Sequence, residues 1–174
     1  MLTVRETVAD RAAMLDLGQR LAGVLRAGDV VVLTGVLGAG KTTMTQGIAA
    51  GLRVRGPITS PTFVIARVHP SEVGGPALVH VDAYRLGSIA EVDDLDLDAT
   101  LESAVTVVEW GEGLVDDLAS DRVEIVIERP RGDHLAGPDG DRDLASDVAA
   151  PRTVTVTSVG DRWSDVAWPG PATP

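Results

Sequence analysis

The chain has 174 residues and a mass of 18.1 kDa, a size that suits one domain with a sizeable core. Its 15 Lys and Arg residues against 26 Asp and Glu residues give a formal net charge of −11, so it lacks the basic surplus with which proteins bind nucleic acid non-specifically. The absence of cysteine excludes disulfides, thiolate zinc sites and cysteine nucleophiles, and it fits a reducing cytoplasm.

The first 52 residues of the chain alternate between strand and helix patterns. Residues 2–8 predict a short strand, and Asp10 then caps a helix whose apolar side chains follow the 3.6-residue period. We expect this helix to end at Gly28. An apolar strand over residues 30–34 and a helix over residues 41–52 follow.

The rest of the chain predicts further strands. Their expected ranges are 63–68, 77–81, 104–108, 123–127 and 154–159. The third of these is continuously apolar, as in a strand covered on both faces. The last two alternate between apolar and polar residues, which favours an antiparallel edge of the sheet.

The remaining segments complete the expected domain. Residues 88–102 are acidic and predicted to be partly helical, whereas residues 130–151 are rich in Gly, Asp and Pro and predict a flexible insertion. The tail, residues 169–174, is predicted to be disordered. We therefore expect one α/β domain over residues 1–168, with three layers around a mixed central sheet. Because no signal-like or membrane-length apolar stretch is visible, we expect a cytoplasmic protein without membrane contact.

Residues 35–43, GVLGAGKTT, match the phosphate-binding pattern G-x-x-x-x-G-K-[ST] between a predicted strand and a predicted helix, as the motif requires. Its glycines let consecutive N–H groups converge on an anion, and the helix adds the positive end of its dipole. Lys41 is expected to face the β- and γ-phosphates, and Thr42 to offer its hydroxyl to Mg²⁺. The residues expected to bind nucleotide here are Gly38, Ala39, Gly40, Lys41, Thr42 and Thr43. The fold expected is therefore a P-loop NTPase-like domain.

Two carboxylates end predicted apolar strands. Asp82 closes the segment ALVHVD, and Glu109 closes AVTVVE. If both strands lie parallel to residues 30–34, both carboxylates emerge beside Lys41 and Thr42. One would then hold the metal while the other positions the attacking water.

Two further positions have open interpretations. Thr62 lies with Ser60 in the segment SPTF, which is either a loop ordered by a triphosphate or a rigid structural turn. His80 lies on the same side of its strand as Asp82, so a contact between them is feasible. The favoured interpretation of His80 is a buried, hydrogen-bonded histidine with a structural role.

The segments GVLGAGKTT, SPTF, HVDAYRL and VVEWGE, in this order, resemble the TsaE family of small bacterial P-loop ATPases. The resemblance extends over residues 10–128, with Val36 where the family often has Asp. It implies a protein that binds ATP and Mg²⁺, hydrolyses ATP slowly on its own, and supports threonylcarbamoyladenosine modification of tRNA. The implied partners are TsaD and TsaB, which transfer the group to adenosine 37, and ATP hydrolysis is implied to reset that pair. Contact with tRNA is implied only within the complex.

The resemblance also implies roles for particular residues. Lys41 would bind phosphate, Thr42 and Glu109 would coordinate Mg²⁺, and Asp82 would support the metal or the water. Thr62 would belong to a switch-like loop, and Glu112 would contact nucleotide just after the Glu-Trp pair. For the adenine pocket, Arg142 or Arg152 is a candidate.

Three alternatives stay open at this point. A small-molecule P-loop kinase would need an arginine-rich lid, whereas residues 130–151 contain more Asp and Gly than Arg. A GTPase is disfavoured because no N-K-x-D motif is present. A nucleotide-gated assembly module with negligible turnover is compatible with the same motifs.

Overall fold

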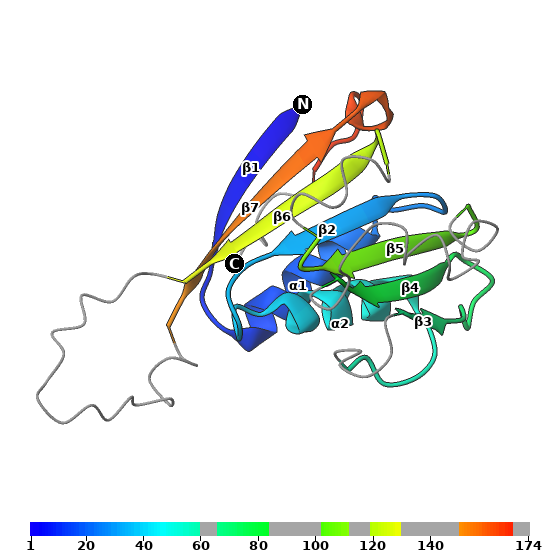
Figure 1. Cartoon of the computed structure of the whole chain (residues 1–174), viewed down its shortest axis with the longest axis horizontal. Helices are drawn as coiled ribbons and strands as arrows, with labels where there is room; N and C mark the ends of the chain where they lie inside the picture. Colours follow the sequence, from blue (N-terminus) through cyan, green and yellow to red (C-terminus); the bar gives the residue numbers. More distant parts are fainter. Residues whose placement is uncertain (60–65, 84–101, 112–118, 130–149, 169–174) are drawn as a thin grey trace, which may run out of the picture.

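The computed structural model describes residues 1–59, 66–83, 102–111, 119–129 and 150–168. The strands within these ranges are β1 (Leu2–Val8), β2 (Val30–Thr34), β3 (Ala66–His69), β4 (Ala77–Asp82), β5 (Ala104–Glu109), β6 (Arg122–Glu128) and β7 (Arg152–Val159). They form one sheet in the order β1-β7-β6-β2-β5-β4-β3 (Figure 1).

The centre of the sheet is parallel and its flanks are antiparallel. Strand β2 lies between β5 and β6 and runs parallel to both, and β4 runs parallel to β5. Strand β7 pairs antiparallel with β6 and with β1, where Leu2 lies opposite Ser158, and β3 pairs antiparallel with β4. The predicted α/β class and mixed sheet are confirmed.

The edge position predicted for residues 123–127 and 154–159 was wrong. Strand β7 lies between β6 and β1. Strand β6 is not at an edge, because β2 pairs with one side of it and β7 with the other. The alternation arises because β6 has one buried and one more exposed face, as its burial pattern shows. An alternating sequence reports how many faces are covered and does not report the position of the strand in the sheet.

Two helices pack against each other and cover one face of the sheet (Figure 1). Helix α1 (Arg11–Ala22) begins after Asp10, whose carboxylate accepts a hydrogen bond from the Ala13 N–H at 2.9 Å. Helix α2 (Lys41–Leu52) has the predicted range. The axes approach so closely that a Cβ on Gly47 would lie 2.4 Å from the Leu15 carbonyl oxygen.

The predicted end of α1 at Gly28 was wrong. The helix ends at Ala22 with Gly23 as its C-cap, and Gly28 lies in the following turn with φ of +88°. Leu25 extended the apolar periodicity past the real end, because it is buried against the core from a non-helical segment.

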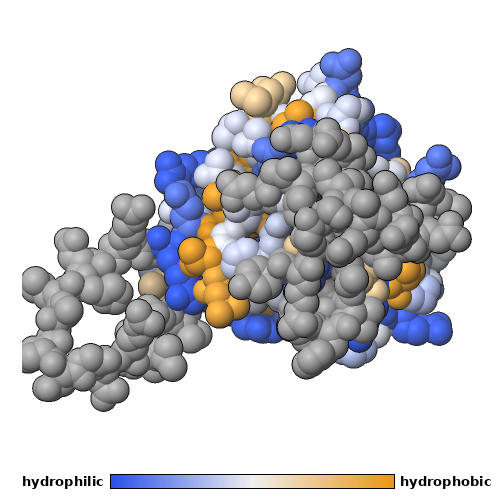
Figure 2. All heavy atoms as spheres, in the orientation of Figure 1, coloured by the Kyte–Doolittle hydropathy of each residue, from blue (hydrophilic) through white to orange (hydrophobic). Residues whose placement is uncertain are grey.

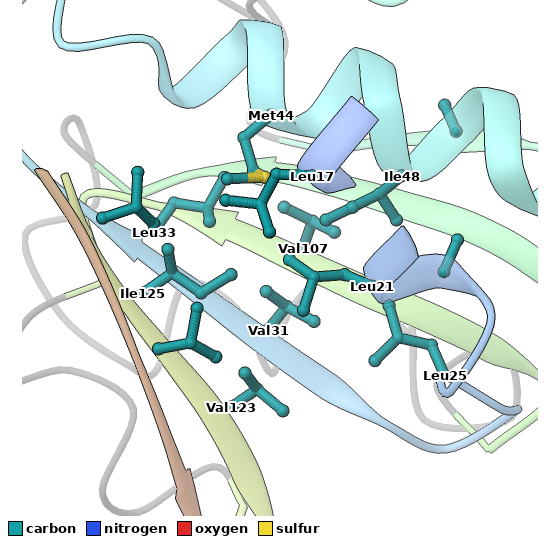
Figure 3. Close-up of a cluster of buried hydrophobic side chains, with 14 of the residues drawn as sticks. Leu17, Leu21, Leu25, Val31, Leu33, Met44, Ile48, Val107, Val123 and Ile125 are labelled. Atoms are coloured by element: carbon teal, nitrogen blue, oxygen red, sulfur yellow. The ribbon is translucent and has the colours of Figure 1, made fainter. Parts of the chain in front are cut away.

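The main core lies between the two helices and the sheet. Figure 3 shows side chains from the helices packed against side chains from the sheet. The labelled residues, which include Leu25 from the segment after α1, are Leu17, Leu21, Leu25, Val31, Leu33, Met44, Ile48, Val107, Val123 and Ile125. A smaller cluster consists of Val79, Val81, Ala83, Ala104 and Val108. The predicted helical segment 88–102 and the predicted insertion 130–151 lie mostly outside the described residues, and the tail 169–174 lies wholly outside them.

Polar residues dominate the visible surface of the described residues, with apolar residues gathered between them (Figure 2). Among the exposed large apolar side chains are Val36 and Leu37 in the phosphate loop, and Leu37 is 84% exposed. In the described part of the chain, neither helix is long and apolar enough to cross a membrane.

Candidate nucleotide-binding site

The GVLGAGKTT segment forms a compact loop between β2 and α2. Gly35, Gly38 and Gly40 have φ values of +156°, +71° and +117°, which residues with a Cβ rarely adopt. Gly40 is the N-cap of α2 and supplies no side-chain oxygen, so the first N–H groups of the helix keep their capacity to bind an anion. The loop therefore has the backbone geometry of a phosphate cradle.

Lys41 lies inside this loop. Its Nζ donates hydrogen bonds to the carbonyl oxygens of Gly35 at 2.7 Å and Val36 at 3.2 Å. Burial lowers the pKa of the Lys41 ammonium, while the charges of Glu109 and Asp82 act in the opposite direction. A positive charge is thus held at the centre of the loop, where phosphate oxygens would bind.

Trp110 forms one wall around this charge. The Lys41 Nζ lies 3.5 Å from the centroid of the Trp110 ring, within cation–π range. Trp110 has a φ of +64°, an uncommon value for a bulky residue. Its backbone N–H donates a hydrogen bond to the Leu33 carbonyl oxygen at 2.9 Å. The strained turn directly after β5 therefore directs the indole towards Lys41.

The sheet brings the two predicted carboxylates together. Because β4, β5 and β2 are parallel, Asp82 lies opposite Glu109 in the register, and Glu109 lies opposite Leu33. Both carboxylates therefore end their strands at the edge where the phosphate loop begins. The condition that the sequence prediction required, parallel strands on this side of β2, is met.

Glu109 is the centre of a buried hydrogen-bond network, with 2% of its surface exposed. The Thr42 hydroxyl lies 3.1 Å and 3.2 Å from its two carboxylate oxygens, and the Thr45 hydroxyl lies 3.5 Å from Oε1. His80 Nε2 lies 2.8 Å from the same Oε1. Helix α2 and strand β4 thus hold one carboxylate from two sides.

His80 is fully buried, as the sequence analysis favoured, but its partner in this network is Glu109. A contact with Asp82 was feasible because residues two apart on one strand share a face. The structure shows an imidazole that reaches across to the neighbouring strand β5.

Arg129 also contacts the phosphate loop, and the sequence analysis missed it. Its Nη2 donates to the Gly38 carbonyl oxygen at 2.9 Å, and a Cβ on Gly38 would lie 2.7 Å from that nitrogen. Arg129 directly follows β6, the parallel neighbour of β2, so the sheet order brings it to the loop. No local pattern in the sequence signals this contact.

The described residues contain no group of three or more His, Asp or Glu side chains arranged to hold a metal ion. The oxygen pair of Thr42 and Glu109 nevertheless suits Mg²⁺, which binds hard oxygens and keeps several ligands for water and phosphate. The residues present therefore fit a magnesium ion that is bound together with a nucleotide.

Some of the predicted site residues cannot be placed. Thr62, Glu112 and Arg142 lie outside the described residues. Arg152 begins β7, and because Glu128 pairs with Thr153, it lies at the end of the sheet where β6 finishes. Its Nη1 donates to the Ala150 carbonyl oxygen.

Comparison with known proteins finds relatives of this chain. A protein of Streptomyces coelicolor named tRNA threonylcarbamoyladenosine biosynthesis protein TsaE is 57% identical over 152 residues, which cover 87% of this chain and 94% of that protein. A protein of the same name from Bacillus subtilis is 37% identical over 143 residues, or 82% of this chain and 77% of that protein.

The fold is also similar to a solved structure. The crystal structure of Bacillus subtilis YdiB matches with a TM-score of 0.67 and 30% identity, over 93% of this chain and 89% of that chain. The family model described as threonylcarbamoyl adenosine biosynthesis protein TsaE matches residues 8–135, well over half of the chain. The chain therefore belongs to the TsaE family.

Proposed function

We propose that this protein is a Mg²⁺-dependent ATPase that supports threonylcarbamoyladenosine modification of tRNA. The observation that carries the proposal is the contact of Thr42 with both carboxylate oxygens of Glu109, directly beside the buried Lys41. Family membership assigns the biological context, since the relatives are named for threonylcarbamoyladenosine biosynthesis.

The proposed roles follow from chemistry at this edge of the sheet. The backbone of Gly38, Ala39 and Gly40 and the N-terminus of α2 bind the phosphates, with Lys41 against the β- and γ-phosphates. Thr42 and Glu109 hold Mg²⁺, which when bound would neutralise charge on the phosphate oxygens. Asp82, which lies opposite Glu109 in the register, supports the metal or orients the attacking water.

Thr43, Thr62 and Glu112 complete the proposed nucleotide site. Thr43 lies in the first turn of α2, next to Thr42. The roles proposed for Thr62 and Glu112 are based on the motif match alone. We also propose that ATP hydrolysis resets a complex with TsaD and TsaB, and that tRNA is met only within that complex.

The test is phosphate release from ATP by the purified chain, with and without TsaD and TsaB. We expect slow release alone, faster release with the partners, and none with EDTA. Lys41→Ala should abolish nucleotide binding measured by calorimetry. Glu109→Gln should keep most of the nucleotide binding and lower turnover about 100-fold or more, because the metal loses its anionic ligand.

Other outcomes would point to the alternatives. Phosphorylation of a small molecule in a metabolite screen would indicate a kinase, and GTP preferred over ATP would indicate a GTPase. Partner binding that depends on ATP without turnover would indicate an assembly module. Unchanged turnover in both variants would overturn the site assignment.

A further inference from the structure

His80 is the contact that β4 makes with Glu109. Its side chain is fully buried, and its Nε2 lies 2.8 Å from Glu109 Oε1. A carboxylate oxygen is a hydrogen-bond acceptor, so the His80 tautomer with a proton on Nε2 suits this contact. Burying the imidazole and the carboxylate removes both groups from water, which costs free energy. Their hydrogen bond offsets part of this cost, so the contact is unlike a chance meeting of two surface groups.

The other contacts of Glu109 come from the opposite side. Thr42 and Thr45 both belong to α2, and their hydroxyls approach the carboxylate at 3.1 to 3.5 Å. Thr45 also donates to the Lys41 carbonyl at 3.1 Å, so its hydrogen is shared between two acceptors. His80 therefore supplies the shortest hydrogen bond to Glu109 among the described residues, and it comes from a strand that is paired on both sides, with β5 and with β3.

From this geometry we infer that His80 is a positioning residue for Glu109. By holding Oε1, it fixes the rotation of the carboxylate, whose two oxygens Oε1 and Oε2 lie 3.1 Å and 3.2 Å from the Thr42 hydroxyl, beside which the metal is proposed to bind. Partners that orient a metal ligand commonly change metal affinity or activity by about 10-fold to 100-fold when they are replaced. The inference rests on the proposed function, in which Glu109 serves Mg²⁺.

Two substitutions separate positioning from simple core filling. The side-chain amide nitrogen of Gln extends about as far as Nε2 of histidine, whereas that of Asn extends only as far as Nδ1. His80→Gln therefore keeps a donor for Glu109 and His80→Asn removes it, although both place an amide in the same buried space. We expect His80→Asn to weaken Mg²⁺ binding to the nucleotide-loaded protein about 10-fold or more in calorimetry, and His80→Gln to restore most of that loss.

His69 provides a matched control. It is also buried, but its bonded atom is Nδ1, which lies 3.2 Å from the Arg55 carbonyl oxygen and away from Glu109. His69→Asn and His69→Gln should therefore change thermal stability without changing Mg²⁺ affinity. Nucleotide binding in EDTA should stay close to the wild-type value in all four variants, because the loop itself is unaltered.

A measurement on the wild-type chain removes any dependence on variants that fail to fold. The chain has three histidines, so ¹⁵N spectra of histidine-labelled protein are simple to assign. We expect His80 Nε2 to carry a proton and its signal to move when Mg²⁺ is added to the nucleotide-loaded protein. The inference would be overturned if Nε2 carries no proton, or if the chemical shift of the His80 Nε2 signal does not change when Mg²⁺ is added.

The two proposals fail in different ways. If the wild-type chain binds no nucleotide, the proposed function is wrong, and the inference about His80 is then wrong as well. If the wild type binds Mg²⁺ and ATP while His80→Asn and His80→Gln show the same Mg²⁺ affinity, only the positioning role of His80 is wrong.

Discussion

Lys41 and Glu109 show how burial changes the behaviour of charged groups in this site. Lys41 is 5% exposed and Glu109 is 2% exposed, so each depends on neighbours for the hydrogen bonds that water would otherwise supply. Lys41 obtains them from the carbonyls of its own loop, and Glu109 from Thr42 and His80. A bound phosphate could take over the Lys41 contacts without leaving a charge unpaired.

His69 is expected to make stability depend on pH. Burial, with smaller contributions from His80 and Arg67, lowers the pKa of His69, against the raising effect of its bond to the Arg55 carbonyl. The unfolded chain therefore binds a proton at about pH 6.5, where the folded chain does not yet bind one. The stability due to neutral His69 is present above that pH and is lost as pH falls through the lowered value.

Urea unfolding between pH 7.5 and 5.5 measures this effect, across a range of about one unit on either side of the usual histidine pKa. We expect the free energy of unfolding to fall with pH more steeply for the wild type than for His69→Asn, which keeps a donor for the Arg55 carbonyl but does not titrate. Equal slopes in the two proteins would show that His69 does not contribute.

Close contact between the two helices makes Gly47 a sensitive position. A Cβ there would meet the Leu15 carbonyl at 2.4 Å and the Gly18 Cα at 3.0 Å, both parts of the backbone. We expect Gly47→Ala to lower the free energy of unfolding by at least about 1 kcal/mol, because the overpacking exceeds the gain in helix propensity. Chemical unfolding checks this, and the helix shift should also weaken nucleotide binding, since α2 begins at Lys41.

Gly75 is the control for that substitution. A Cβ on Gly75 would have the Ser71 hydroxyl as its nearest neighbour, at an ordinary contact distance of 3.7 Å, and the φ of Gly75 is not in the left-handed region. Gly75→Ala should leave stability within about 0.5 kcal/mol of the wild type. If Gly47→Ala and Gly75→Ala lower the free energy of unfolding by the same amount, the contact between α1 and α2 is less tight than the structure shows.

The elements near the site could be predicted better than those far from it. The range of α2 and the parallel strands ending in Asp82 and Glu109 follow from local patterns, because a phosphate loop requires a strand before it and a helix after it. The end of α1 and the interior positions of β6 and β7 were mispredicted, since they depend on contacts distant in the sequence.

The same division applies to the side chains of the site. Lys41, Thr42 and Glu109 come together as their motifs predict. The reach of His80 to β5 and of Arg129 to Gly38 depends on which strands are neighbours, and a single sequence does not state strand order. The roles assigned to Asp82, Thr62 and Glu112 stay predictions.

The charge of the whole chain predicts weak binding to tRNA by itself. With a formal net charge of −11, the chain is repelled by the phosphate backbone and has few cations to release counterions from it. We expect little retention of tRNA by the isolated protein at physiological salt in fluorescence anisotropy, and retention once TsaD and TsaB are added. Tight binding by the chain alone, weakened steeply by salt, would instead reveal a concentrated basic surface.

The pairing of β1 with β7 has a consequence for synthesis on the ribosome. Of the described strands, β1 comes first along the chain and lies at the edge of the sheet, and its neighbour there, β7, comes last. During synthesis, residues 2–8 therefore lack their native partner strand until residues 152–159 have left the exit tunnel. A nascent chain that stalls before β7 is made would expose both β1 and the side of β6 that pairs with β7, and unpaired strand edges of this kind promote aggregation.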